Sequence, residues 1–293
     1  MKLDGWPPDP TLLVTWAVGA VACAAVMAVL WCRQLATRDA TAVDVAWSAL
    51  LGVLALSYAL VGTAPEWRRV LLALVAGAWS TRLSLHLLRD RLLARRGEDG
   101  RYSKLRASWG TQAPRNFFVL YQAQAALAAL LSLPFLLVAF HAAERVATAE
   151  LVGLAVVLAG LCGETIADRQ LAAHRSDPAR AGRTCRRGLW AWSRHPNYFF
   201  EWCQWLGFAL LAWPAPLGFA GMLAPALLLW LILKVTGIPP TEAQAARSRP
   251  DYAAYQRSTS AFVPWPPRRA ARVPPDTTTA AQQPARPARK ETA

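Results

Sequence analysis

The chain has 293 residues, of which 55% are hydrophobic and only 17% are charged, whereas soluble domains carry about 25% charged residues. Its 32 Lys and Arg against 18 Asp and Glu give a formal net charge of +14. The apolar content excludes a disordered chain over most of the length, and five cysteines are too few for a disulfide scaffold. Two classes remain: a nucleic-acid-binding protein with a large core, or an integral membrane protein whose positive charge is sorted to one side.

Seven apolar segments long enough to span a membrane follow one another along the chain. A helix of about 20 apolar residues crosses the hydrocarbon core of a bilayer. The first segment, 11–32, has no charged residue and is longer than the core of a signal peptide, so we interpret it as a retained helix. The remaining predicted spans cover residues 42–62, 67–88, 116–140, 151–166, 198–213 and 217–235.

The basic residues are concentrated in alternate connections between these segments. Of the 32 Lys and Arg, 27 lie in 33–39, 89–115, 168–196 and 234–293. Such an excess marks the cytoplasmic side of a membrane protein. The sequence therefore predicts an all-α integral membrane protein of the bacterial inner (plasma) membrane. It has about seven transmembrane helices, its N-terminus outside and its C-terminus in the cytoplasm. Because the charge follows topology rather than one helix or motif, we expect no nucleic-acid partner.

Composition divides the chain into three parts. We expect an N-terminal transmembrane helix with the first cytoplasmic loop at 1–40, and a membrane domain at 41–266. The tail at 267–293 is rich in Pro, Ala, Thr and Arg. That composition cannot bury a hydrophobic core, so we expect the tail to be disordered.

Several common catalytic and metal-binding patterns are absent from the sequence. It has no Gly-rich phosphate loop, no G-x-S-x-G elbow and no C-x-x-C pair, and its four histidines are never clustered. A membrane di-iron desaturase and a Ser-His-Asp hydrolase are therefore poor interpretations, and we expect no bound metal.

Ionisable residues inside the predicted spans are the first candidates for chemistry, because a charge at the centre of a bilayer costs about 2.5–3.5 kcal/mol. Asp44 and Arg82 lie at similar depth on consecutive antiparallel spans, where they form either a structural ion pair or the wall of a polar pocket. Glu164 and Asp168 are four residues apart on one helix face, so they repel each other. They form either a solvated helix end or a pair that needs a nearby cation. The candidate cations are Arg169, Arg175 and Arg194, with a metal as the weaker alternative.

The segment 188–205, GLWAWSRHPNYFFEWCQW, combines a helix start with basic and polar side chains. Pro196 suits the first turn of a helix, whose free N–H groups and positive dipole end attract anions. Together with guanidinium groups, such a helix end binds phosphate. Asn197 and Glu201, four residues apart on one face, favour a ligand site over a simple interfacial anchor of Trp and Arg. The basic residues of this predicted anion site are Arg186, Arg187, Arg194 and His195.

A polar segment follows the last predicted span. Gly237 and the two prolines after it end the helix. Glu242, Tyr252 and Tyr255 then lie on a cytoplasmic segment that can fold over the predicted anion site. The two tyrosines are three residues apart and so face the same side of a helical turn.

These motifs resemble the membrane family labelled DUF1295, which is related to the steroid 5-alpha-reductase C-terminal domain and more distantly to isoprenylcysteine carboxyl methyltransferases. The resemblance covers roughly residues 40–266, and several separated motifs carry it in the same order. Besides GLWAWSRHPNYFFEW they are DVAWS at 44–48, WSTRLSLHLLRDR at 79–91, EDGRYSKLR at 98–106, GETIADRQL at 163–171, TGIPPTE at 236–242 and YAAYQRSTSAFVPWP at 252–266.

The resemblance implies an oxidoreductase that uses NADPH to reduce a conjugated double bond in a lipid-soluble, sterol-like or acyl, substrate. In the related reductases the C-terminal helices hold NADPH from the cytoplasmic side. By this resemblance the cofactor is lined by Arg194, His195, Asn197, Tyr198, Glu201, Tyr252 and Tyr255. The predicted cofactor site is completed by Arg186, Arg187, Glu242, Glu164 and Asp168. From depth and chemistry, the predicted catalytic residues are Asp44, Arg82 and Tyr102, because a tyrosine can protonate a developing enolate.

Phe200 departs from the N-Y-F-G-E pattern that is usual in the family, where glycine lets a neighbour or the cofactor approach the helix. We expect Phe200 either to face lipid or to narrow the pocket. Two alternatives to the reductase stay open. One is a membrane methyltransferase that uses S-adenosylmethionine, and the other is a non-catalytic membrane protein whose basic loops interact only with anionic lipid.

Overall fold

The computed structural model describes residues 10–93 and 97–268, and the predicted tail lies outside them from residue 269 onward. All regular elements of this part of the chain are helical, and one isolated bridge joins Ser193 to Ser260. The α-helices are α1 (Pro10–Thr37), α2 (Ala42–Val61), α3 (Glu66–Leu87), α4 (Gly100–Trp109), α5 (Ala113–Leu131), α6 (Leu133–Ala139), α7 (Thr148–Arg175), α8 (Pro196–Ala212), α9 (Leu223–Trp230), α10 (Ile238–Ser248) and α11 (Tyr252–Ser258). A π-helical turn, η1 (Leu88–Leu93), continues α3, and another, η6 (Leu231–Val235), continues α9.

Among the described residues, six helical stretches are long and apolar enough to cross a membrane, which is the pattern of an all-α integral membrane protein. They cover Pro10–Thr37, Ala42–Val61, Glu66–Leu93, Gly100–Ala139, Thr148–Arg175 and Gly218–Ser248. The predicted span at 198–213 forms α8, which has 17 residues and is not one of the six.

The predicted span at 116–140 is not one continuous helix. It divides at Ser132 into α5 and α6, and Pro134 stands in the first turn of α6. Proline has no N–H to donate and its ring crowds the preceding turn, so the regular hydrogen-bond ladder is interrupted there. The last predicted span is also divided, into a 3₁₀ turn at Gly218–Met222, α9 and η6.

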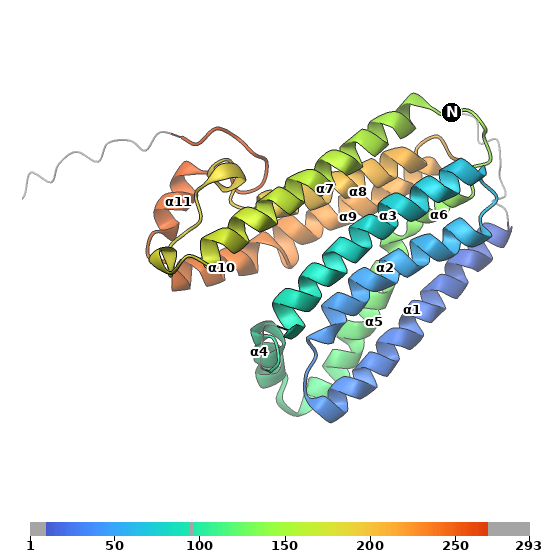
Figure 1. Ribbon diagram of the computed structural model, residues 1–293. Helices are drawn as coiled ribbons and strands as arrows, with labels where there is room; N and C mark the ends of the chain where they lie inside the picture. The colour runs from blue at the N-terminus through green and yellow to red at the C-terminus, as the bar shows by residue number, and fades with distance from the viewer. Residues whose placement is uncertain (1–9, 94–96, 269–293) are drawn as a thin grey trace, which may run out of the picture.

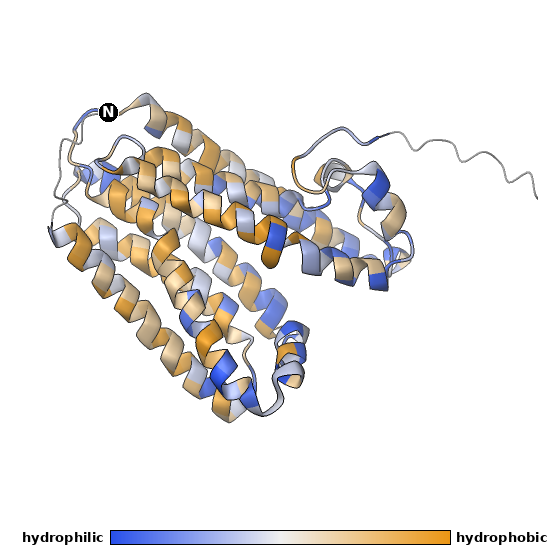
Figure 2. Cartoon of the chain, turned by 180° about the vertical axis from the view of Figure 1, so that it is seen from behind, coloured by the Kyte–Doolittle hydropathy of each residue, from blue (hydrophilic) through white to orange (hydrophobic). Residues whose placement is uncertain are grey.

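The helices form two groups that lie side by side (Figure 1). Helices α1, α2, α3, α5 and α6 make one bundle, and the pair α7 and α8 lies against it through α6, with α9 reaching α5. The long helices consist largely of hydrophobic residues (Figure 2), and many of their large apolar side chains are exposed, as contact with lipid requires. The largest buried side chains between the two groups include Trp79, Phe135, Trp205 and Phe208.

Helices α7 and α8 run antiparallel, and they pack closely because glycines line their contact. A Cβ at Gly153 would lie 2.8 Å from the carbonyl oxygen of Gly207, and one at Gly160 would lie 2.8 Å from that of Phe200. Small residues let helix backbones approach in membranes, where packing rather than water drives association. This close pairing fixes the polar side chains of α7 relative to those of α8.

A buried arginine fastens the start of α3 to the start of α7. Arg68 is 1% exposed, and its Nε donates to Oε1 of Glu150 at 2.7 Å. Its Nη1 donates to the carbonyl oxygens of His141 and Ala143 at 2.8 and 2.6 Å. Burial and the nearby charge of Arg68 lower the pKa of His141, which lies in the loop between α6 and α7. This network therefore orders the loop at the end of the molecule opposite α4.

Candidate functional site

A mostly buried ionic cluster joins α3 to α7. The guanidinium of Arg82 on α3 forms an ion pair with Glu164, and its Nη1 donates to Oδ2 of Asp168 at 3.0 Å. Glu164 and Asp168 share one face of α7, as their spacing predicts, and Arg82 is the cation that their repulsion requires. The sequence-based expectation that this cation is Arg169, Arg175 or Arg194 is wrong.

The ion pair between Asp44 and Arg82 considered from the sequence does not form. On α3, Ser80 donates its hydroxyl to the carbonyl oxygen of Ser48 at 2.7 Å, and the hydroxyls of Ser84 and Ser48 lie 2.9 Å apart. This face of α3 therefore packs on α2. With 3.6 residues per turn, Arg82 points to the opposite side of α3, toward α7.

Asp44 belongs to a second cluster, which joins α2 to η1 and α4. Tyr102 donates its hydroxyl to Oδ1 of Asp44 at 2.7 Å. Arg91 and Arg101 both bond to Oδ2 of the same carboxylate, Arg101 at 2.5 Å. The structure thus brings together two of the three predicted catalytic residues, Asp44 and Tyr102, and places Arg82 in the cluster between α3 and α7.

The inward face of α8 adds a third carboxylate to the cluster of Arg82. Glu201 accepts hydrogen bonds from two indole groups, Trp205 Nε1 to Oε1 at 3.1 Å and Trp79 Nε1 to Oε2 at 3.3 Å. It forms no ion pair with any residue in the described part of the chain, although Arg82 interacts with its charge. One turn earlier, Oδ1 of Asn197 is buried and has no hydrogen-bond partner among the described residues.

Two residues of this site are not predicted from the sequence. Gln204 is fully buried, and its Nε2 donates to Oε2 of Glu164 at 2.7 Å. Trp79 reaches Glu201 from α3. The signal for Gln204 was its spacing, because Asn197, Glu201 and Gln204 repeat at intervals of four and three and so share one helix face. Trp79 carries no such signal, since its partner lies on a distant helix.

A hollow of about 510 Å³ lies between α3, η1 and α7, beside the ionic cluster. Arg89 and Arg169 line it, and both side chains are exposed without a hydrogen-bond or ion-pair partner in the described residues. The hollow therefore offers two free guanidinium groups next to buried carboxylates. Its other lining residues are Arg82, Leu85, His86, Asp90, Thr165 and Asp168.

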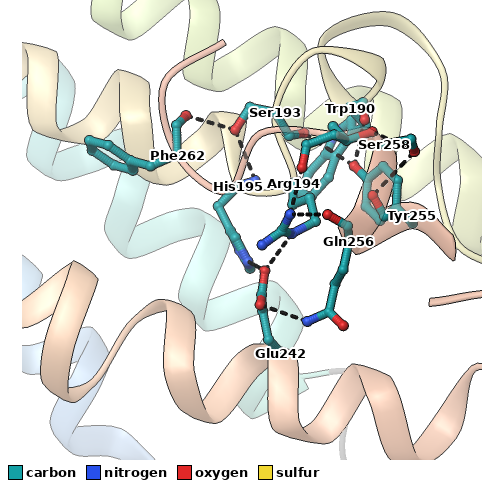
Figure 3. Close-up of polar contacts among 10 residues, drawn as sticks. Trp190, Ser193, Arg194, His195, Glu242, Tyr255, Gln256, Ser258 and Phe262 are labelled. Carbon is teal, nitrogen blue, oxygen red and sulfur yellow. Dashed lines mark hydrogen bonds and ion pairs between the residues drawn. The ribbon is translucent and has the colours of Figure 1, made fainter. Parts of the chain in front are cut away.

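The predicted cofactor residues at the start of α8 bond to one another (Figure 3). Arg194 donates from Nε to Oε1 of Glu242 at 2.6 Å, and from Nη1 to the carbonyl oxygens of Gln256 and Thr259 at 3.0 and 2.5 Å. Nε2 of His195 lies 3.3 Å from the same oxygen of Glu242, whose Oε2 accepts from Gln256 at 2.8 Å. This network fastens α10 and α11 to the loop before α8.

The segment that carries the two predicted tyrosines lies over the start of α8, as the sequence predicts (Figure 3). The hydroxyl of Tyr255 lies 2.5 Å from the carbonyl oxygen of Trp190 and 3.1 Å from that of Ser193. Burial raises the pKa of Tyr255, and it raises the pKa of Tyr252 to about 12. Both side chains are therefore neutral near pH 7.

The remaining predicted cofactor residues lie beside this network. Arg186 donates from Nη2 to the carbonyl oxygen of Asp251 at 2.7 Å, and Arg187 is exposed. The ring of Tyr198 stacks on His195 with a centroid distance of 5.3 Å. Two arginines of the predicted anion site, Arg186 and Arg194, thus form hydrogen bonds to other residues of the chain, although the side chain of Arg186 is exposed.

Phe200 packs into the contact between α7 and α8. A Cβ added at Gly163 of α7 would overlap its ring, and the ring of Phe199 meets it edge-on at 5.3 Å. The glycine that permits the close approach therefore stands on α7. Phe200 fills the space that this glycine leaves, so its ring packs against α7 and does not face only lipid.

Comparison with known proteins adds one match. A family model described as a protein of unknown function (DUF1295) matches residues 30–259, which is most of the chain. No curated protein and no solved structure matches it. Within the described ranges, no group of three or more His, Cys, Asp or Glu side chains is placed to hold a metal ion.

Proposed function

The chain belongs to the DUF1295 family, and we propose that it is a membrane-embedded reductase that uses NADPH to reduce a conjugated double bond. Its substrate is a lipid-soluble, sterol-like or acyl, compound. One observation carries the proposal: α8 presents two hydrogen-bond acceptors, Glu201 and the buried Oδ1 of Asn197, and the charge of Glu201 interacts with Arg82, which also lines a hollow with exposed guanidinium groups. Such acceptors suit carboxamide and ribose donors, and guanidinium groups suit phosphate.

The proposal includes a seventh membrane span and an orientation. Helix α8 has 17 residues, which at about 1.5 Å each reach roughly 26 Å, close to the thickness of a hydrocarbon core. It pairs antiparallel along α7, a membrane-length helix. With α8 as a span, 27 of the 32 Lys and Arg lie on one side, which supports a bacterial inner-membrane protein with its C-terminus and the hollow on the cytoplasmic side.

The residues present fit NADPH in two places. Arg89 and Arg169, which have no partner among the residues that the structure describes, are guanidinium groups that would bind phosphate. Each oxygen of Glu201 accepts one indole N–H and has a further lone pair, and Oδ1 of Asn197 has no partner in the described part of the chain. Both would accept N–H or O–H donors of the nicotinamide half. When bound, the cofactor supplies a hydride to the substrate carbon.

The proton for the other carbon has a candidate source in Tyr102. Its hydroxyl donates to Asp44, whose carboxylate is also bound by Arg91 and Arg101. We assign Tyr102 to proton donation, for which its hydroxyl turns from Asp44 to the substrate carbon, and Asp44 to holding that hydroxyl until the substrate binds. Arg82 holds the carboxylates of α7 in place. Tyr102→Phe is therefore expected to abolish reduction while NADPH still binds.

The decisive experiment measures NADPH binding to the full-length protein in detergent. Glu201→Ala and Arg89→Ala are each expected to weaken binding by at least about tenfold, because a hydrogen bond to a charged group contributes roughly 1.5–3 kcal/mol. Arg145→Ala, an exposed arginine in the loop between α6 and α7, is the matched control for loss of one positive charge. Equal affinity of the wild type, Glu201→Ala and Arg89→Ala would refute the site.

A second candidate function has one observation in its favour. Glu164, Asp168 and Glu201 place three carboxylates around the single guanidinium of Arg82. An excess of negative charge suits the sulfonium of S-adenosylmethionine, the cofactor of the related methyltransferases. Thermal unfolding with each cofactor separates the two functions, since only the true ligand raises the melting temperature. A protein stabilised by neither is the non-catalytic alternative.

A further inference from the structure

The carboxylate of Glu201 is held differently from its neighbours in the cluster. Glu164 and Asp168 are paired with the positive charge of Arg82, whereas each oxygen of Glu201 accepts one neutral indole N–H. An indole donates a single hydrogen bond and accepts none. The two indoles therefore fix the direction of this carboxylate without cancelling its charge, and they leave its other lone pairs open.

The two indoles cannot easily turn away. Trp79 and Trp205 are both 0% exposed, and their rings meet edge-to-face at 5.2 Å and 82°. Phe208 packs edge-on against both, at 6.2 Å from Trp79 and 5.8 Å from Trp205. Buried rings in such contacts stay in one rotamer, because the close-packed interior has no room for another.

The two tryptophans come from different parts of the fold. Trp205 lies one turn after Glu201 on α8, whereas Trp79 lies on α3 in the other group of helices. The direction of the carboxylate thus depends on how α3 sits against α8. Arg82, three residues after Trp79 on the same helix, fixes α3 to α7 at this level.

We propose that Trp79 and Trp205 are positioning residues that hold Glu201 with its open lone pairs toward the bound ligand. The ligand group is a neutral N–H or O–H donor, such as a carboxamide or a ribose hydroxyl. That the ligand is NADPH rests on the proposed function above; the orientation of Glu201 by the two indoles does not.

The test replaces each indole by a ring without a donor. Trp79→Phe and Trp205→Phe are each expected to weaken NADPH binding about tenfold and to have no further effect in a Glu201→Ala background. Trp202→Phe is the matched control on α8, because its Nε1 donates to the carbonyl oxygen of Pro225 instead. A substitution that acts only on folding would weaken binding equally with and without Glu201, and that result would overturn the proposal.

A nuclear magnetic resonance measurement on the protein without cofactor tests this proposal independently of the proposed function. In ¹⁵N-Trp-labelled protein, Glu201→Ala is expected to shift the indole resonances of Trp79 and Trp205 and to leave that of Trp202 in place. Unshifted resonances would overturn the positioning role, whatever NADPH does. Shifted resonances in a protein that binds no NADPH would overturn the reductase and support the positioning role.

Discussion

Replacing Arg68 by Met is expected to reduce the free energy of unfolding by about 3–5 kcal/mol, the usual cost of removing one partner from a buried ion pair. Arg68 and Glu150 are 1% and 4% exposed. The substitution leaves the buried carboxylate of Glu150 with one remaining donor among the described residues, the backbone N–H of Ala147 at 2.9 Å. It also removes the donor from the carbonyl oxygens of His141 and Ala143.

The single substitution lowers stability in two ways: it leaves the charge of Glu150 unpaired, and it leaves these carbonyl oxygens without a donor. A double variant distinguishes the two. The double variant Arg68→Met with Glu150→Met removes both charges but still leaves the carbonyl oxygens without their donor. Each such buried group costs about 1–3 kcal/mol. The double variant is therefore expected to lie between Arg68→Met and the wild type. Arg69→Met is the control, since Arg69 donates to the carbonyl oxygens of Ala64 and Ala59 and contacts no carboxylate in residues 10–93 and 97–268.

The assay is thermal unfolding of the full-length protein in detergent, followed by circular dichroism. For a chain of this size, 1 kcal/mol corresponds to roughly 2–4 °C, so Arg68→Met is expected to melt on the order of 10 °C lower. If Arg68→Met melts no earlier than Arg69→Met, the buried pair does not stabilise the fold as argued. A double variant that melts at the wild-type temperature would show that the hydrogen bonds to the carbonyl oxygens contribute nothing to stability.

Three further predictions concern the packing of α7 on α8 and the C-terminal segment. Gly163→Ala is expected to reduce the free energy of unfolding by about 1–3 kcal/mol, because the added methyl group overlaps the ring of Phe200. In a double-mutant cycle with Phe200→Ala the two substitutions should be coupled, and strictly additive effects would contradict the overlap. Tyr255→Phe should lower the melting temperature, because two buried carbonyl oxygens lose their donor; an unchanged melting temperature would contradict this. Burial raises the pKa of Asp251, but hydrogen bonds from Thr184 lower it more, so that this pKa lies below its ordinary value of 3.8. Its contribution to stability is therefore present above pH 3.8 and lost as the pH falls through the lowered pKa, so Asp251→Asn should destabilise the protein at pH 7 and match the wild type in acid.

Much of the architecture can be predicted from the sequence, because the relevant signals are local. Runs of apolar residues and the break at Gly237 depend only on neighbours along the chain, and six of the seven predicted spans match membrane-length helical stretches. The division of 116–140 at Ser132 was not predicted. The same holds for pairs on one helix: Glu164 with Asp168, and Asn197 with Glu201, share a face because of their spacing alone.

Partners on different helices were decided only by the tertiary structure. Asp44 and Arg82 have similar depth and opposite charge, but the serine face of α3 packs on α2 and turns Arg82 toward α7. A rotation of α3 about its axis would change every one of these partners without changing the hydropathy pattern.

The basic residues show the same division. Their sorting along the sequence indicates a membrane topology, because it depends only on the order of spans and loops. Which guanidinium groups are free depends on packing: Arg194 is bonded to Glu242 and the C-terminal segment, whereas Arg89 and Arg169 stay exposed at the hollow. The sequence thus determined the class of protein and the helix faces, and the rotation and contact of those helices determined the site.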